Sequence, residues 1–254
     1  MEEGKVAGLK SLTILLGSIG VITIVGVTLY LLLAGPNYCP EIDNMNESNP
    51  ITEFSVQVVG DSLFGADADG CASVSTFMSL ILWLQVEDNS VPGATVIGDE
   101  SIPEQYVSGD WNWTVIDGGG NDIMPHCTEN DCDEVLDEII TDSGEGLIPD
   151  LVEKAQNDGS NVILIGYYSV PKGSEYEPVI LEVELINDRY NEFAKANEGV
   201  YFISLKDVMS PEETPELYSD DLVHPSIDGN LAIGEHIADF IIDEHKKETG
   251  MWFR

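Results

Sequence analysis

Residues 54–63 have the sequence FSVQVVGDSL, in which a strand-like apolar run over 54–59 ends abruptly in the turn-forming residues GDSL, 60–63. A serine at the carboxyl end of a first β-strand lies where an α/β enzyme would hold a nucleophile. The same four residues are also ordinary turn chemistry, because Gly and Asp tolerate positive φ and Ser bonds locally to the backbone. The significance of Ser62 therefore depends on the rest of the chain.

After this turn, apolar runs suited to buried strands alternate with stretches of helical period. We predict strands near residues 53–59, 94–98, 112–117, 161–167 and 200–205. The fourth is apolar on both faces, as a central strand of a parallel sheet should be. Alternation of this kind indicates βαβ units. The expected fold class is α/β, with a five-stranded parallel sheet between two layers of helices.

An uncharged run of 23 residues, 12–34, precedes this region. At about 1.5 Å per residue it is long enough to cross the ~30 Å hydrocarbon core of a membrane as a helix. Lys5 and Lys10 precede the run, whereas the next basic residue after it is Lys154. The positive-inside rule therefore predicts a cytoplasmic N-terminus.

These features divide the chain into three predicted parts. Residues 1–34 form a cytoplasmic tip and a transmembrane signal anchor, 35–51 form a stalk rich in Pro, Asn and acids, and 52–254 form one α/β domain. The expected localisation is a single-pass membrane protein with this domain outside the cytoplasm. A cleaved signal peptide, giving a secreted protein, is the alternative.

The formal net charge of the chain is −37. Such an acidic domain should be repelled by nucleic acid and by anionic lipid head groups, so no nucleic-acid partner is expected. Acids spread along the whole sequence are typical of solvation in salty surroundings. Residues 67–70, DADG, resemble a calcium loop, but Gly65 and Thr76 occupy the first and twelfth positions of that loop, where acids are required. No metal or other cofactor is expected.

Four cysteines lie in the part of the chain predicted to be outside the cytoplasm, where disulfides persist. Four cysteines allow three pairings. Cys127 and Cys132 enclose only four residues, so we favour a local bridge between them, which leaves Cys39 with Cys71. Zinc is the competing interpretation, although the spacing matches no two-plus-two ligand pattern and the only nearby histidine is His126.

Two further motifs follow predicted strands. Gly-Asn121-Asp comes after the third strand, and Asp221-Leu-Val-His224-Pro comes after the fifth. In an open parallel sheet, ligands bind outside the carboxyl ends of the strands, so Ser62 and both motifs should converge on one edge. His224 can be the base that a serine nucleophile needs, and Asp221 the acid that orients it. The backbone N–H of Ser62 and the amide of Asn121 are candidate donors to an oxyanion. A surface histidine and a plain glycine-rich turn are the alternatives.

With these residues in place, the chain resembles the SGNH, or GDSL-type, hydrolase family of serine esterases and lipases. The motifs GDSL at 60–63, G-x-N-D at 119–122 and D-x-x-H-P at 221–225 occur in the family's order. The resemblance implies a five-stranded parallel sheet, no cofactor, Ser62 as nucleophile, His224 as base with Asp221 as its partner, and Asn121 as an oxyanion donor. It also implies a third donor from a glycine after the second strand, for which Gly98 is the best match.

The resemblance and the predicted span together indicate a membrane-anchored, extracytoplasmic serine hydrolase. Its expected substrate is an acyl or acetyl ester of a lipid or glycan, cleaved through an acyl-enzyme on Ser62. Two alternatives stay open. One is a non-catalytic domain that binds envelope glycan or lipid on the same fold, and the other is a metal-dependent phosphoesterase built around Asp117 and Asp122.

Four apolar or aromatic residues flank the predicted strand ends: Phe64, Met124, Tyr167 and Tyr168. They are either substrate walls or ordinary packing. The sequence leaves the identity of the ester and the oligomeric state open.

Overall fold

A computed structural model describes residues 54–65, 72–127 and 132–250 of the 254-residue chain. Its centre is a sheet of five parallel strands in the order β2-β1-β3-β4-β5. The strands are β1 (Val56–Val59), β2 (Val86–Asp88), β3 (Trp113–Ile116), β4 (Asn161–Gly166) and β5 (Val200–Ser204). The predicted α/β class with a five-stranded parallel sheet is therefore confirmed.

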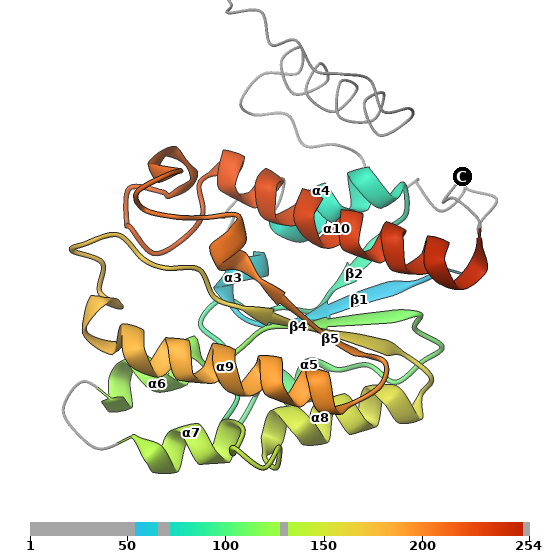
Figure 1. Ribbon diagram of the computed structural model, residues 1–254, viewed down its shortest axis with the longest axis horizontal. Coiled ribbons are helices and arrows are strands. Elements are labelled where there is room, and N and C mark those ends of the chain that lie inside the picture. The colour runs from blue at the N-terminus through green and yellow to red at the C-terminus, as the bar shows by residue number, and fades with distance from the viewer. Residues whose placement is uncertain (1–53, 66–71, 128–131, 251–254) are drawn as a thin grey trace, which may run out of the picture. The chain divides into compact units, whose positions relative to one another are not determined.

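Helices cover both faces of the sheet (Figure 1). One face carries α4 (Val74–Leu82) and α10 (Ile227–Thr249). The other carries α5 (Ile102–Gln105), α6 (Gly120–Cys127), α7 (Asp133–Ile139), α8 (Leu147–Asn157) and α9 (Ile180–Ala196). Short segments complete the fold: α3 (Ser62–Gly65) and the 3₁₀ turns η1 (Glu177–Val179), η2 (Leu205–Asp207) and η3 (Pro215–Leu217).

Alternate strand residues supply the two cores that hold these layers together. In β1, Val56 and Val58 pack with the helices α4 and α10, whereas Val59 packs into the core that includes residues of α8 and α9. All three side chains are fully buried. This arrangement explains why the central strands are apolar on both faces, since each face of a doubly covered sheet is a core.

The second strand lies at Val86–Asp88, and the prediction of a strand at 94–98 is wrong. The backbone N–H groups of Val96 and Ile97 donate to the two carboxylate oxygens of Asp122, at 2.8 and 2.9 Å, instead of pairing with another strand. The segment is therefore a loop held by a side chain. The true strand has only one buried residue, which is typical of a short, charged edge strand.

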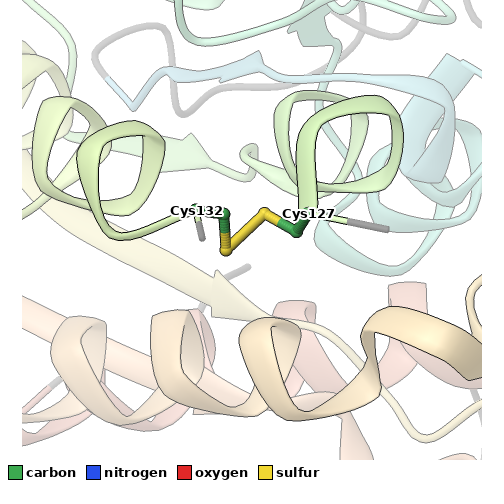
Figure 2. Close-up of a disulfide and its surroundings, with 2 residues drawn as sticks. All are labelled: Cys127 and Cys132. Atoms are coloured by element: carbon green, nitrogen blue, oxygen red, sulfur yellow. A yellow bond between two sulfur atoms is a disulfide. The ribbon is translucent and has the colours of Figure 1, made fainter. Parts of the chain in front are cut away.

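A disulfide joins Cys127, the last residue of α6, to Cys132, which precedes α7, with the two Cα atoms 4.9 Å apart (Figure 2). This is the favoured local bridge. Because both sulfur atoms are used in the bond, neither thiol is available as a zinc ligand. Cys39 and Cys71, the other predicted pair, lie outside the described residues.

The predicted localisation needs correction. Within the described ranges, no helix is both long enough and apolar enough to cross a membrane. The 23-residue helix α10 has the length but carries acids and lysines along its course. The predicted span at 12–34 and the predicted stalk at 35–51 lie outside the described residues. The prediction of a single-pass membrane protein with an extracytoplasmic domain is therefore withdrawn.

Candidate active site

Ser62 opens the short helix α3, directly after the carboxyl end of β1. The turn that presents it depends on Gly60, because a Cβ at this position would overlap the carboxylate of Asp117. The side chain of Gln105 also holds this glycine: Oε1 accepts the Gly60 N–H at 2.7 Å, and Nε2 donates to the Gly60 carbonyl at 3.0 Å. The backbone that carries the serine is thus fixed from two sides.

His224 connects Ser62 to Asp221. Its Nε2 lies 2.9 Å from the Ser62 hydroxyl oxygen, and its Nδ1 lies 2.7 Å from Oδ2 of Asp221. With Asp221 ionised, Nδ1 carries the proton that it donates, which leaves Nε2 as the acceptor of the serine hydroxyl. The three side chains therefore form a hydrogen-bonded chain, although Ser62 and His224 are 162 positions apart in the sequence.

The carboxylate of Asp221 is held in its charged form. Partial burial favours the neutral acid, but hydrogen bonds from the Ser219 hydroxyl, from the His224 ring and from two backbone N–H groups outweigh it and lower the pKa of Asp221. The Ser219 hydroxyl and the N–H groups of Val223 and His224 all donate to Oδ1, at 2.6, 2.8 and 2.9 Å. Oδ2 is thereby left for the imidazole.

The end of the histidine loop is fixed by the start of α10. The side chain of Ser226, two residues after His224, caps this helix by accepting the N–H of Gly229 at 3.2 Å. Capping fixes the backbone where the loop enters the helix. The loop is also closed on itself, because the Ser219 N–H donates to the His224 carbonyl at 2.9 Å. The imidazole is therefore presented by a short, braced segment.

Asn121 lies in the first turn of α6 and lines the same cavity as Ser62 and His224. Its Nδ2 donates to the carbonyl of Ala94 at 2.9 Å, and its Oδ1 accepts the hydroxyl of Tyr176 at 3.1 Å. These two bonds fix which end of the amide is nitrogen. Since Nδ2 has two hydrogens and Ala94 takes one, the amide can offer the second to the cavity.

Tyr167 joins the nucleophile turn to the start of α6. Its hydroxyl donates to Oδ2 of Asp61 at 2.9 Å and accepts the Gly120 N–H at 3.1 Å. Burial, followed by the nearby charge of Asp61, raises the pKa of Tyr167 well above its usual value and keeps it a donor. Asp61 in turn accepts the N–H of Leu63 at 2.9 Å. Asp61 is thus a brace within the turn, as its position beside the serine suggests.

Asp117 lies beneath this turn, completely buried. Its Oδ1 accepts the Asp61 N–H at 3.1 Å, whereas its Oδ2 has no hydrogen-bond partner within the described part of the chain. Burial and the neighbouring negative charge of Asp61 raise the pKa of Asp117 well above its usual value. Burial therefore favours the neutral form of Asp117 in the folded protein.

The phosphoesterase alternative depended on Asp117 and Asp122, and both side chains accept backbone N–H groups of neighbouring segments. Asp117 is completely buried, and both oxygens of Asp122 accept backbone N–H groups of the loop at 96–97. Burial raises the pKa of Asp122, with the same N–H groups opposing the rise. Among the described residues, no group of three or more histidines, cysteines or acids is placed to hold a metal ion.

Gly98 follows the loop that Asp122 holds, and its φ of +106° is a conformation that favours glycine. It is described, but it is not among the residues that line the cavity. Its role as a third oxyanion donor stays a prediction.

The cavity beside Ser62 opens to solvent. Of the predicted substrate walls, Tyr167 and Tyr168 line it. Phe64 and Met124 do not: Phe64 is fully buried in the core, and Met124 packs against the other core.

Sequence reasoning missed several residues of the site, among them Gln105, Tyr176 and Ile180. Val183, Ile186 and Tyr190 recur at helical spacing, which indicates the buried face of α9. That spacing could not show that Val183 also lines the cavity beside Ser62.

The chain matches the GDSL-like lipase/acylhydrolase family over residues 58–232. No curated protein matches it.

Several solved structures share the fold. A protein described as a putative lipolytic protein of the G-D-S-L family from Desulfitobacterium hafniense DCB-2 is 17% identical, with a TM-score of 0.57 over 73% of this chain and 98% of that one. A carbohydrate acetylesterase from Sinorhizobium meliloti is 14% identical, with a TM-score of 0.56 over 76% and 100% of the two chains. A catalytic mutant of an acetylxylan esterase from Geobacillus stearothermophilus is 18% identical, with a TM-score of 0.54 over 74% and 94%.

Proposed function

Because the chain belongs to the GDSL-like lipase/acylhydrolase family and is an ester-cleaving hydrolase, we propose that it cleaves carboxylic esters through an acyl-enzyme formed on Ser62. The observation that carries this proposal is the hydrogen-bonded chain from the Ser62 hydroxyl through His224 to Asp221, with distances of 2.9 and 2.7 Å. A serine hydroxyl becomes an effective nucleophile when an oriented imidazole takes its proton.

In the first half of the reaction, Ser62 Oγ attacks the ester carbonyl carbon while its proton passes to Nε2 of His224. The carbonyl oxygen becomes an oxyanion, with the Ser62 N–H, the Asn121 amide and, as a third donor, the Gly98 N–H proposed to stabilise it. The bond from the carbonyl carbon to the alcohol oxygen then breaks, and His224 returns the proton to the departing alcohol. The product is an acyl ester of Ser62.

In the second half, a water molecule attacks the acyl carbon as His224 accepts one of its protons. The bond from that carbon to Ser62 Oγ breaks, and the proton returns to Ser62. The net change is ester plus water to carboxylic acid plus alcohol. Asp221 stays ionised throughout and stabilises the imidazolium that forms twice in the cycle.

Ser62→Ala tests the proposal. Turnover of a short-chain aryl ester and covalent labelling by a fluorophosphonate should both fall to background, because neither reaction can proceed without Oγ. Ser143→Ala, at an exposed serine between α7 and α8, is the matched control and should keep both. Turnover that persists unchanged in Ser62→Ala would overturn the proposal.

The same experiment addresses the non-catalytic alternative. A domain that only binds glycan or lipid would leave the fluorophosphonate probe unreacted in the wild-type protein. The substrates predicted from the sequence, acyl or acetyl esters of a lipid or glycan, are candidates to be compared on a panel with Ser62→Ala as the blank. The carbohydrate acetylesterases of the same fold make acetylated glycans a necessary part of that panel.

A further inference from the structure

The cavity beside Ser62 has a largely aliphatic wall. Val170, Ile180, Val183 and Val223 contribute to its lining. Of the described residues that line it, none is a lysine or arginine. Recognition of a phosphate or carboxylate group normally uses such a cation. The net charge of −37 would also disfavour anionic ligands. The group that fits this cavity is therefore uncharged.

The tyrosines of the cavity direct their hydroxyls into the protein. Tyr168 donates to the carbonyl of Val223, Tyr176 donates to Oδ1 of Asn121, and Tyr167 donates to Asp61. Their rings line the cavity, while their hydroxyl protons are already used. A sugar would need partners for its own hydroxyl groups, since burying unpaired polar groups is costly. An alkyl group needs none.

The two halves of an ester leave Ser62 at different steps of the reaction. The leaving alcohol oxygen has to face Nε2 of His224, which returns its proton. Tyr176 bonds to Asn121, and Ile180 and Val183 follow it along the same stretch of chain, with both at the cavity. The aliphatic residues of α9 thus line the same cavity as Ser62, to which the acyl group stays bound after the alcohol has left.

We infer that this wall is an acyl-binding site for uncharged aliphatic chains of several carbons, so that the enzyme prefers esters of short and medium aliphatic acids to acetylated glycans and to anionic lipids. This inference rests on the proposed function of Ser62. The reaction is the hydrolysis already described, in which the aliphatic acid is released from Ser62 by water.

The dependence of kcat/KM on the length of the acyl chain tests for this site. With p-nitrophenol as a constant leaving group and rates corrected for spontaneous hydrolysis, kcat/KM for the butyrate ester should exceed that for the acetate by about 15-fold, the value expected for burying two methylenes. The hexanoate should be at least as good as the butyrate. Acetylated xylan oligosaccharides and lysophospholipids should be poorer substrates than the butyrate.

Two variants of one helix locate the site. Ile180 is half-buried at the start of α9 and lines the cavity, whereas its neighbour Leu181 is 71% exposed and does not. Ile180→Ser should reduce the ratio of kcat/KM for butyrate to kcat/KM for acetate from about 15 to about 3 or less. Leu181→Ser, the matched control, should keep the wild-type ratio. Ile180→Phe, which fills the cavity without adding polarity, should lower hexanoate turnover most.

The outcomes separate this inference from the function on which it rests. Turnover that depends on Ser62 but is fastest for acetate or for acetylated glycans would overturn the acyl site and leave the serine hydrolase intact. A butyrate preference that survives both Ile180 variants would also overturn it. Turnover that does not depend on Ser62 would overturn the proposed function, and the acyl site with it.

Discussion

Tyr176 controls the orientation of the Asn121 amide, and Tyr176→Phe tests how much that orientation matters. The change removes one hydroxyl and its 3.1 Å hydrogen bond to Oδ1, while Nδ2 keeps its 2.9 Å bond to the carbonyl of Ala94. A hydrogen bond between neutral groups contributes about 0.5–1.5 kcal/mol. If the amide loses that much preference for its active orientation, kcat falls by about 2- to 13-fold.

The effect should appear in kcat and leave KM nearly unchanged, because the aromatic ring that lines the cavity is retained. Asn121→Ala removes the proposed oxyanion donor and should cost about 10²–10³ in kcat. The decisive measurement is a double-mutant cycle on a p-nitrophenyl ester: in the Asn121→Ala background, Tyr176→Phe should cause no further loss, since the hydroxyl acts only through the amide. Tyr106→Phe, which removes a 2.9 Å hydroxyl bond to Asp158, is the control and should leave kcat unchanged.

Additive losses in that cycle would refute this explanation and show that the Tyr176 hydroxyl acts independently of Asn121. A rise in KM with kcat unchanged would also refute it, because it would mean that the hydroxyl contacts the substrate directly. In wild-type protein the hydroxyl proton is committed to Asn121, so we expect neither result.

Three further predictions concern the scaffold. Replacing Cys127 and Cys132 together by Ser should lower the free energy of unfolding by about 2 kcal/mol, from the entropy of the opened loop; an unchanged urea midpoint would contradict this. Gln105→Ala should lower it by about 1–3 kcal/mol and reduce kcat, because both hydrogen bonds to Gly60 are lost; wild-type stability and kcat would count against it. Because the pKa of Asp117 is raised in the folded state, the free energy of unfolding of the wild type should fall as pH rises from the unfolded pKa of about 3.9 through the raised folded pKa. Asp117→Asn keeps an acceptor and cannot ionise, so it should lack this decline and be the more stable at alkaline pH. Parallel pH profiles in chemical denaturation would exclude a protonated Asp117.

Most of the sheet could be predicted because its central strands have a purely local signature. Val162–Ile165 are buried on both faces, and an apolar run of that kind bounded by turns has few other solutions in an α/β chain. The second strand could not be predicted. Val86–Asp88 is short and exposes two of its three residues, while the more apolar segment at 94–98 is a loop because Asp122 takes the N–H groups of Val96 and Ile97. That competition involves residues about 25 positions apart, and no local pattern reports it.

The sequence by itself determined the chemical groups of the site and their order along the chain: a serine after a glycine turn, an asparagine after a later strand, and an aspartate three positions before a histidine. These follow from short motifs whose residue types are required by the chemistry. The parallel topology also predicted that they meet at one edge of the sheet.

Only the tertiary structure decided how these groups are held and what surrounds them. The bonds of Tyr176 to Asn121, of Tyr167 to Asp61 and of Gln105 to Gly60 join residues that are 55, 106 and 45 positions apart. The raised pKa of Asp117 depends on complete burial and on the proximity of another carboxylate. Hydrogen bonds, desolvation and a cavity wall are properties of distance in space, and a motif fixes only distance along the chain.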